Sequence, residues 1–536
     1  MKYDAIIIDS LISYQNVAFD FGLVNLRIDE EIMALPNLMK HFHPAKSESF
    51  VNQTLCLEEC GKLNGICLYD YLKKSGFNCA LVSNVLENEE QLTSLLSEGA
   101  HAVLVSTTWT IGIREVKKVT QLVRNYDAEV PVIVGGVLIY NSYRAYQQMD
   151  DEDFDHQATD EMFFFINQEP ELFEDINMFI VDRSGTNTLS KVLRAIKDKE
   201  DYRSFENTAY YLDHELIFNP QNPEKIDLDN QVIAWNNIEQ KYIPEILPVQ
   251  LSLGCNFNCK FCNFYHKQRC YTKSKEAIRR ELKGIKSLPN VRMIRFVDDS
   301  MPGKVLQNLC EIMIEEKMDI PWTTFIRLDT FIGTDLDLLQ KANCVDVQVG
   351  IESGDDRILK NMNKKVTRDQ YLRILDDLSE LDISIRASFI LGFPGENSDS
   401  INNTIDFLNQ LPTEKNATFY VGIAPFVLIP LSPIYSKSER KAYQLKGNFI
   451  DWQHDNMSSA DVPDYLKKIF LGVKDEVLFT YTADPLDIYL PREPSIQVKR
   501  TRQKYQKGIV KGLAEVELEA LESDLMASLE KMQVLV

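Results

Sequence analysis

The sequence predicts an α/β protein with an N-terminal Rossmann-like domain, a partial (β/α)6 barrel and a mostly helical C-terminal region. Short apolar segments alternate with amphipathic segments of helical period in two separate runs, which is typical of parallel strands joined by helices. A stretch rich in turn-forming residues, 220–231, lies between the two runs. A chain of 536 residues is also too long for one core, so we expect several domains.

The first run covers residues 1–219, the predicted Rossmann-like domain. Its expected strands are the apolar segments AIIIDS, FNCALVS, HAVLVSTT and VPVIVGG. The helical segments between them are CGKLNGICLYDYLKKSG, NEEQLTSLLSEG and IREVKKVTQLVRNY, and a further helix and strand follow MFIVDRSG. In an open sheet of this kind a ligand lies beyond the carboxyl ends of the strands.

The second run covers residues 244–428 and follows a predicted linker at 220–243. Six strand segments alternate with five helical segments: LPVQLSLG, VRMIRFVDD, PWTTFIRLD, VDVQVGIES, ISIRASFILGFPGE and ATFYVGIAPF. This order predicts a partial barrel, in which functional groups lie where strands end and loops begin. Residues 429–536 are expected to form a mostly helical region that closes the site and selects the substrate.

The composition excludes some partners. The formal net charge is -22, and such a surface repels phosphate backbones, so we expect no nucleic-acid partner. Two basic stretches, from 267 and from 498 onward, are expected to be solvated helix faces. No apolar run reaches the roughly 18 residues that span a bilayer, and no secretory signal is evident, so we expect a cytoplasmic protein with no membrane partner.

Three of the ten cysteines are clustered in the segment GCNFNCKFCNF: Cys255, Cys259 and Cys262. Thiolates this close together on one loop can reach several corners of an iron–sulfur cluster. Three thiolates leave one iron of a four-iron cluster open, and an open position distinguishes catalytic from structural metal sites. The main alternative is a structural Zn²⁺ site that takes Cys270 or His266 as its fourth ligand.

The segment CNFNCKFC resembles the CxxxCxxC signature of the radical S-adenosylmethionine (SAM) superfamily, including the aromatic Phe261 before the last cysteine. Four later segments are similar to segments of the same barrel, in the same order: FVDDSM (296–301), IRLD (326–329), VGIESGD (349–355) and ILGFPGE (390–396). The resemblance implies a [4Fe–4S] cluster on the three cysteines that cleaves SAM reductively. It also implies an external electron donor such as flavodoxin or ferredoxin.

The same resemblance implies which residues surround SAM. An aromatic ring would pack near the adenine, an arginine fork would pair with the carboxylate, a Glu–Ser pair would contact the ribose and amino group, and glycines would let the backbone approach the adenine. In that order, these residues are Phe261, Arg327, Glu352 with Ser353, and Gly392 with Gly395. Asp298 and Asp299 would point at SAM or at the substrate.

A Rossmann-like domain ahead of such a barrel resembles the cobalamin-binding branch of the superfamily. The segments HAVLVSTTWT (101–110) and VPVIVGG (130–136) carry this resemblance. The residues implied to cradle cobalamin are Ser106, Thr107, Thr108, Gly135 and Gly136, with Trp109 and Tyr140 as further contacts. None of the seven histidines lies in a D-x-H-x-x-G motif, so axial coordination by histidine is not expected.

The resemblance therefore implies a cobalamin-dependent radical SAM C-methyltransferase that acts on a natural-product intermediate or on a peptide, such as a ribosomal precursor peptide. DWQHDNMSS (451–459) is similar to a W-x-H-x-x-M stretch of some cobalamin-type relatives, so Trp452 and His454 are expected to contact the substrate. One alternative is a radical SAM cyclase or oxidoreductase with an empty N-terminal domain. Another is a non-catalytic iron–sulfur or zinc protein.

Overall fold

The computed structural model describes residues 2–11, 24–110, 112–154, 162–167, 169–264, 269–481 and 483–533. Within these ranges the chain divides into two compact units. The first contains residues 2–11 with Lys62–Ile243 and Tyr435–Ser438, and the second contains residues 24–61 with Pro244–Ile434 and Glu439–Val536. Residues 24–61, assigned by the sequence prediction to the first domain, group with the second unit, and residues 220–243, predicted as a linker, group with the first.

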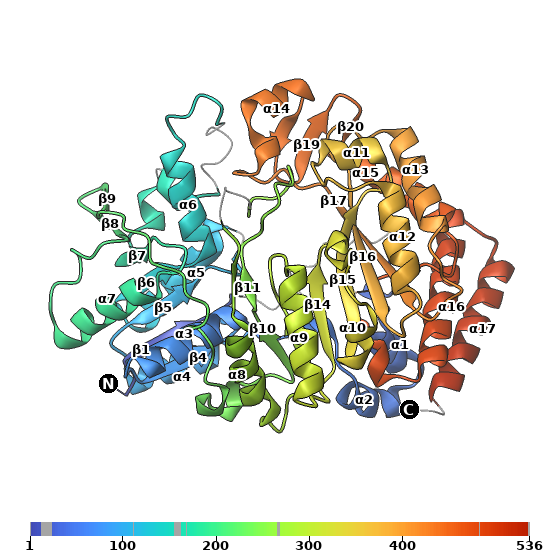
Figure 1. Cartoon of the computed structure of the whole chain (residues 1–536). Helices are drawn as coiled ribbons and strands as arrows, with labels where there is room; N and C mark the ends of the chain where they lie inside the picture. The colour runs from blue at the N-terminus through green and yellow to red at the C-terminus, as the bar shows by residue number, and fades with distance from the viewer. Residues whose placement is uncertain are drawn as a thin grey trace. The chain divides into compact units, whose positions relative to one another are not determined.

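The first unit is built on a seven-stranded sheet of order β4-β1-β5-β6-β7-β8-β9 (Figure 1). Its parallel strands are β1 (Ala5–Ile8), β4 (Cys79–Val82), β5 (Val103–Ser106), β6 (Val132–Gly135) and β7 (Met178–Ile180). Two antiparallel strands, β8 (Thr208–Leu212) and β9 (Glu215–Phe218), extend one edge. The connecting helices are α3 (Leu63–Lys74), α4 (Glu89–Glu98), α5 (Ile113–Tyr126), α6 (Val137–Gln147) and α7 (Thr186–Asp198).

The order of these strands determines where a ligand would bind in the first unit. β1 lies between β4 and β5, which are the next two strands of this sheet along the chain. The order then continues outward through β6 and β7. In a doubly wound sheet of this order, ligands bind beyond the carboxyl ends at the point where the winding reverses. Here that point is the junction of β1 and β5, so the residues directly after these two strands form the first unit's candidate site.

The second unit contains a parallel sheet of order β10-β13-β14-β15-β16-β17-β21. The six predicted strands are β10 (Ile246–Val249), β13 (Met293–Phe296), β14 (Trp322–Ile326), β15 (Cys344–Glu352), β16 (Ser384–Leu391) and β17 (Thr418–Pro425). The helices between them are α8 (Lys275–Lys286), α9 (Gly303–Glu315), α10 (Asp337–Lys341), α11 (Asp356–Asn361), α12 (Arg368–Leu378) and α13 (Ser398–Asn409). The predicted partial barrel is confirmed, and β21 (Leu478–Phe479) adds a strand that the sequence analysis did not anticipate.

The C-terminal region is mostly helical, as predicted. It contains α14 (Lys437–Ala442), α15 (Val462–Gly472), α16 (Arg492–Lys511) and α17 (Glu515–Gln533). A small sheet of β18 (Lys446–Asn448), β19 (Asp451–His454) and β20 (Met457–Ser458) interrupts the helices. α16 and α17 run side by side and are joined by a turn at Gly512, whose φ of 72° favours glycine (Figure 1).

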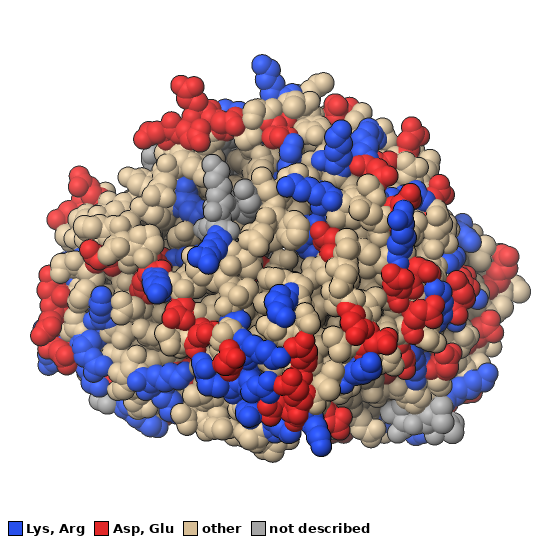
Figure 2. Space-filling view, viewed as in Figure 1, with Lys and Arg blue, Asp and Glu red and all other residues tan. Residues whose placement is uncertain are grey.

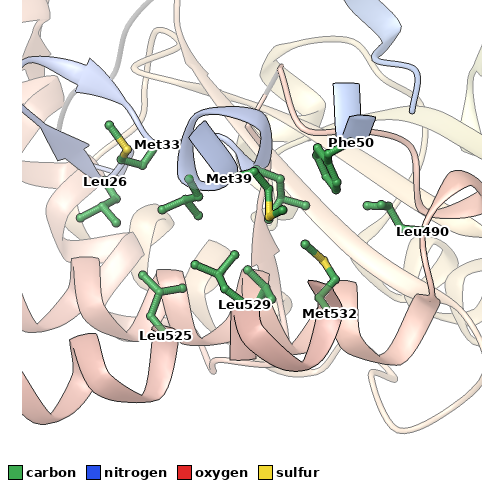
Figure 3. Close-up of a cluster of buried hydrophobic side chains, with 11 residues drawn as sticks. Leu26, Met33, Met39, Phe50, Leu490, Leu525, Leu529 and Met532 are labelled. Atoms are coloured by element: carbon green, nitrogen blue, oxygen red, sulfur yellow. The ribbon is translucent and has the colours of Figure 1, made fainter. Parts of the chain in front are cut away.

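A hydrophobic cluster attaches residues 24–61 to the C-terminal helices. α17 contributes Leu525, Leu529 and Met532, which are fully buried (Figure 3). They pack against α1 (Leu35–Phe42) and α2 (Pro44–Gln53) through a set of equally buried side chains: Leu35, Leu38, Met39 and Phe50. Two segments from opposite ends of the chain thus share one core in the second unit.

The basic stretch from 498 onward, predicted as a solvated helix face, is instead largely buried in α16. Arg502 forms a bidentate pair with Asp484 at 2.8 and 2.6 Å, and Lys507 lies 2.7 Å from Asp475. Lys499 pairs with Asp487 in the same way. The prediction was wrong because charge alone does not reveal which helix face meets buried carboxylates, and a buried cation needs such a partner.

The other basic stretch, from 267 onward, has partly exposed basic side chains in α8. In α8, Lys275 pairs with Glu311 and Arg279 pairs with Glu315 and Glu316 of α9, all at least partly exposed. Figure 2 shows Lys and Arg side chains interspersed with Asp and Glu on the face that carries these helices. In the part of the chain that the structure describes, no helix is long and apolar enough to cross a membrane.

Candidate active site

The three clustered cysteines lie on the loop between two short antiparallel strands, β11 (Ser252–Leu253) and β12 (Tyr271–Thr272). The Cys259 side chain is buried, and Cys255 and Cys262 are half-buried. The Cys262 N–H donates to the Cys259 carbonyl at 3.1 Å, which closes a tight turn. The loop therefore brings all three thiols to the carboxyl end of the first barrel strand, as predicted for parallel barrels.

The segment after α11 anchors the middle of this loop. The Lys260 N–H donates to the Met362 carbonyl at 2.9 Å, and Asn363 Nδ2 donates to the Asn258 carbonyl at 2.6 Å. Each bond fixes a backbone group next to Cys259. The sequence analysis did not identify these residues, because a carbonyl and an amide in a polar turn carry no motif.

Asp298 and Asp299 hold the base of the cysteine loop. Asp298 Oδ1 accepts hydrogen bonds from Leu251 N–H at 3.0 Å and from the Ser252 hydroxyl at 2.7 Å, and also from Ser252 N–H. Asp299 Oδ2 accepts from Gly254 N–H at 2.7 Å. Burial raises the pKa of Asp298 to about 7 against these bonds, which lower it. In the structure both carboxylates thus accept hydrogen bonds from the base of the loop, and their contact with SAM or substrate stays a prediction.

Arg327 follows β14 and is directed at Cys259. Its Nε and Nη2 donate to the two carboxylate oxygens of Asp329 at 2.9 and 3.0 Å, and Nη1 donates to Cys259 Sγ at 3.3 Å. The guanidinium carbon also lies 3.7 Å from the centroid of the Phe257 ring. Burial alone would lower the pKa of Arg327, but the Asp329 carboxylate raises it, so the side chain stays charged.

Glu352 ends β15 at a β-bulge and has a φ of 71°. Its carboxylate lies 3.2 Å from Lys364 Nζ, which also donates to the Gly350 carbonyl at 2.9 Å. Burial lowers the pKa of Lys364, but the charges of Glu352, Tyr371 and Cys259 together outweigh this, so the pKa is raised overall. The neighbouring Ser353 is buried, and its hydroxyl accepts from Asp355 N–H at 3.2 Å. Sequence reasoning missed Lys364, one lysine in a polar turn.

The two glycines predicted to approach the adenine both adopt conformations that favour glycine, with φ of 96° for Gly392 and 94° for Gly395. A Cβ on Gly392 would lie 2.2 Å from Cη2 of Trp452, so this indole packs directly on the backbone. The Gly392 N–H donates to Glu396 at 2.5 Å. Burial raises the pKa of Glu396 to about 8, with the Gly392 bond opposing the shift.

A continuous row of aromatic rings joins the cysteine loop to the small C-terminal sheet. Ring centroids of Phe261 and Phe393 lie 6.5 Å apart, those of Phe393 and Phe426 5.3 Å, and those of Phe426 and Trp452 5.6 Å. Trp452 stacks on His454 with a centroid separation of 5.7 Å. The structure therefore brings together three residues that were predicted separately, namely Phe261, Trp452 and His454.

His454 is a neutral imidazole at the end of this row. Its side chain is fully buried, and burial lowers its pKa. Nδ1 lies 3.3 Å from Asp455 Oδ1, while Nε2 has no hydrogen-bond partner among the described residues. A buried ring nitrogen of this kind can accept or donate one hydrogen bond to a ligand.

In the first unit, the structure brings together the residues predicted to cradle cobalamin. The Thr107 N–H and hydroxyl both donate to the Gly135 carbonyl, at 2.8 and 2.9 Å, and the Ser106 and Thr108 hydroxyl oxygens lie 3.3 Å apart. Gly136 has a φ of 106°, and a Cβ there would lie 2.9 Å from Thr107 N. These residues line the ends of β5 and β6, next to the switch point of the sheet.

Asn64, which the sequence analysis did not identify, links this group to Trp109. Its Nδ2 donates to the Asp9 carbonyl and to the Ser106 hydroxyl, at 2.8 and 2.9 Å. Its Oδ1 accepts from Trp109 Nε1 at 2.9 Å, and Lys62 Nζ lies 4.6 Å from the centroid of the indole. Trp109 nevertheless stays 44% exposed, so a large aromatic surface faces solvent beside the switch point.

The zinc alternative stays a prediction. Within the ranges that the structure describes, no group of three or more His, Cys, Asp or Glu side chains is arranged to hold a metal ion, and this holds for the three loop cysteines as well. The Cys270 thiol lies 3.8 Å from the Tyr271 carbonyl. His266, the other suggested fourth ligand, lies outside the described residues.

Comparison with known proteins relates residues 249–408 to the radical SAM superfamily. A methyltransferase of uncharacterized activity from Pyrococcus horikoshii is 26% identical over 241 residues, which cover 43% of this chain and 52% of that protein. An anaerobic magnesium-protoporphyrin IX monomethyl ester cyclase from Rubrivivax gelatinosus is 21% identical over 63% of this chain and 60% of that protein. A tRNA-2-methylthio-N(6)-dimethylallyladenosine synthase from Neorickettsia sennetsu is 32% identical over 30% and 37%. The chain thus spans from about a third to three fifths of the length of these relatives.

Two solved structures share the fold over most of the chain. The radical SAM methyltransferase TsrM from Kitasatospora setae, solved with cobalamin and a [4Fe–4S] cluster, has a TM-score of 0.55 at 13% identity and covers 81% of this chain and 74% of its own. The cobalamin-dependent radical SAM enzyme OxsB, solved with aqua-cobalamin, has a TM-score of 0.57 at 15% identity, with coverages of 92% and 81%. The chain therefore has the α/β fold of cobalamin-dependent radical SAM enzymes.

Proposed function

Given a radical SAM domain at residues 249–408, we propose that the protein is a radical SAM enzyme with a [4Fe–4S] cluster held by Cys255, Cys259 and Cys262. We further propose that it is a cobalamin-dependent C-methyltransferase. The observation that carries the proposal is the position of three thiols on one short loop at the carboxyl end of the first barrel strand.

The donor set fits such a cluster. Three thiolates leave one iron for SAM, and the cluster, when bound, supplies the electron that breaks a carbon–sulfur bond of SAM. The protein must keep the thiols deprotonated. Burial raises the pKa of the Cys259 thiol, while the charges of Lys364 and Arg327 oppose that shift and favour the thiolate.

The loop at Gly392–Glu396 and the aromatic row support a place for the adenine of SAM. Phe393 lies in this loop and Phe261 packs against it edge-on, and the positive φ of Gly392 lets the backbone come close to a flat ring, here the Trp452 indole. Glu352 and Ser353 lie at the end of the neighbouring strand β15, where they would contact the ribose and amino group. His454 Nε2 is a further group that can bind SAM or the substrate.

The first unit supports binding of cobalamin. Gly136 lets the ends of β5 and β6 approach each other closely, hydroxyl groups line the strand ends, and Trp109 offers an exposed flat surface at the switch point. Cobalamin, when bound, supplies a carrier for the methyl group. The residues of this unit would bind and orient the corrin without a D-x-H-x-x-G histidine.

We propose a small natural-product intermediate or a peptide as the substrate, flavodoxin or ferredoxin as the electron donor, and a cytoplasmic location that keeps thiols reduced. A TsrM structure holds tryptophan as its substrate, which supports a small molecule. A second candidate is a radical SAM cyclase or oxidoreductase. It is favoured by the cyclase match, which covers 63% of this chain against 43% for the methyltransferase match.

The first test replaces all three loop cysteines by alanine. Anaerobically reconstituted wild-type protein is expected to bind about four iron atoms per chain and to cleave SAM, and the triple variant to do neither. Cys270→Ala is the matched control on the same loop and should keep both properties. If Cys270→Ala loses the metal and the bound metal is zinc, the radical SAM proposal is wrong.

Cobalamin binding and product labelling separate the two candidates. The methyltransferase should take up cobalamin, seen in its visible absorption spectrum, and should transfer a deuterated methyl group from labelled SAM to its product. A folded, cluster-loaded protein that binds no cobalamin and transfers no label would favour the cyclase or oxidoreductase.

A further inference from the structure

We infer that Arg327 donates a hydrogen bond to the cluster-bearing thiolate of Cys259 and thereby sets the reduction potential of the cluster. This assigns Arg327 as a positioning residue for the cluster, in place of a partner for the carboxylate of SAM. The inference rests on the proposed function, because it requires a cluster on the cysteine loop.

The carboxylate-binding side of the guanidinium is already occupied. Nε and Nη2 form the bidentate fork with Asp329, and Nη2 also donates to the Lys364 carbonyl at 2.8 Å. Nη1 donates to Cys259 Sγ. Four of the five N–H groups of Arg327 therefore have partners within the protein. A SAM carboxylate would have to displace Asp329 to obtain the same planar recognition.

The surroundings hold this geometry in place. Arg327 is only 7% exposed, and the Phe257 ring covers one face of its guanidinium from within the cysteine loop itself. A buried arginine that is held by a bidentate carboxylate and stacked on a ring loses little further conformational freedom when it donates a hydrogen bond. Nη1 is thus aimed at one sulfur before any cluster assembles.

The charges around Cys259 balance in pairs. Arg327 faces the half-buried Asp329, and the buried Lys364 faces Glu352, so these four side chains carry no formal net charge. The Arg327 N–H donates to Cys259 Sγ at 3.3 Å between nitrogen and sulfur. A directed hydrogen bond is therefore the means by which this group of residues acts on the ligand sulfur.

A hydrogen bond to a ligating sulfur stabilises the reduced form of an iron–sulfur cluster more than the oxidised form, because reduction adds negative charge to the sulfurs. The couple involves one electron, which comes from a low-potential donor protein in the cell. Loss of the bond should therefore make the cluster harder to reduce, and its midpoint potential should become more negative.

The test compares Arg327→Gln with the wild-type protein, both full-length and reconstituted without SAM. Potentiometric titration with dithionite, followed by electron paramagnetic resonance, should give a more negative midpoint for the variant. Its dissociation constant for SAM, measured on the oxidised protein, should stay within about twofold of wild type. An unchanged midpoint with SAM binding weakened about tenfold or more would overturn the inference and restore the carboxylate role.

Two further variants keep the result interpretable. Arg295→Gln removes a half-buried arginine of β13 that contacts Leu57 and Gln348 and not the cysteine loop, and it should leave the midpoint unchanged. Arg327→Lys keeps the charge but not the fork, and it should give an intermediate midpoint. It replaces Arg327→Gln if that variant does not assemble a cluster, and a wild-type midpoint in Arg327→Lys would then reject the inference.

Cluster assembly and SAM cleavage by the wild-type protein distinguish a failure of the inference from a failure of the proposed function. A wild-type protein that assembles no cluster would reject both. A wild-type protein that assembles the cluster and cleaves SAM, combined with an unchanged midpoint in both Arg327 variants, would reject the inference alone.

Discussion

Glu396 shows how one buried side chain makes stability depend on pH. Its carboxyl group is buried and accepts a backbone hydrogen bond from Gly392, and its pKa is raised from 4.5 to about 8. A carboxyl group with a raised folded pKa stabilises the fold fully below its unfolded pKa. That contribution is lost as the pH rises through the folded value.

We expect Glu396→Gln to remove this dependence, because the amide stays neutral while keeping an oxygen for the Gly392 N–H. The variant and wild type should be similar at pH 5, and the variant should be more stable by roughly 1–4 kcal/mol at pH 9. Urea unfolding at both pH values measures the difference. Equal stability at pH 9 would mean that the fold does not raise the pKa of Glu396.

Individual residues also mark the limit of sequence-based prediction at the site. The three cysteines, Phe261 and the glycines near 392 were identified because they occur in spaced motifs. Lys364 and Asn64 were not, because each is one polar residue in a turn or at a helix start, and only the folded chain shows its partners. The role that we infer for Arg327 differs from the expected one for the same reason, since the fork to Asp329 depends on rotamers.

The packing of α17 gives a prediction at the scale of elements. Leu529 of α17 is fully buried against the helices α1 and α2, so Leu529→Ala should leave a cavity in that core. We expect a loss of roughly 2–5 kcal/mol in the free energy of unfolding, measured with urea. Val516→Ala, in the same helix at a position 76% exposed, is the control and should change stability by less than about 0.5 kcal/mol. Equal effects of the two variants would contradict the packing of α17 on α1.

Secondary structure was predicted more reliably than its packing. The six barrel strands were each recognisable as short apolar runs, and their order follows because each helix returns the chain to the next parallel position. β21 was missed because two residues carry no period. The inward face of α16 was misjudged because lysine and arginine usually lie in solvent, whereas here Asp484 and Asp487 neutralise them.

For the whole molecule, the sequence predicted two α/β parts but not the way in which the chain alternates between them. Apolar patterning indicates that Leu35 or Leu529 is buried, and it contains no information about which distant segment covers it. The grouping of residues 24–61 with the second unit depends on distant residues, because Leu55 packs with Ile246 and Met293 and Leu35 shares a core with Leu529. Contacts at such separations have no local signature.

That shared core has a consequence for synthesis on the ribosome. Residues 62–243 can fold as soon as they emerge, but residues 24–61 complete their core only after α17 has been translated. At about 5–20 residues per second, the delay is on the order of half a minute to a minute and a half. We expect ribosome-bound chains that end before Glu515 to be cut by protease within residues 24–61, and released full-length chains to resist. Equal resistance of both kinds of chain would show that residues 24–61 fold without α17.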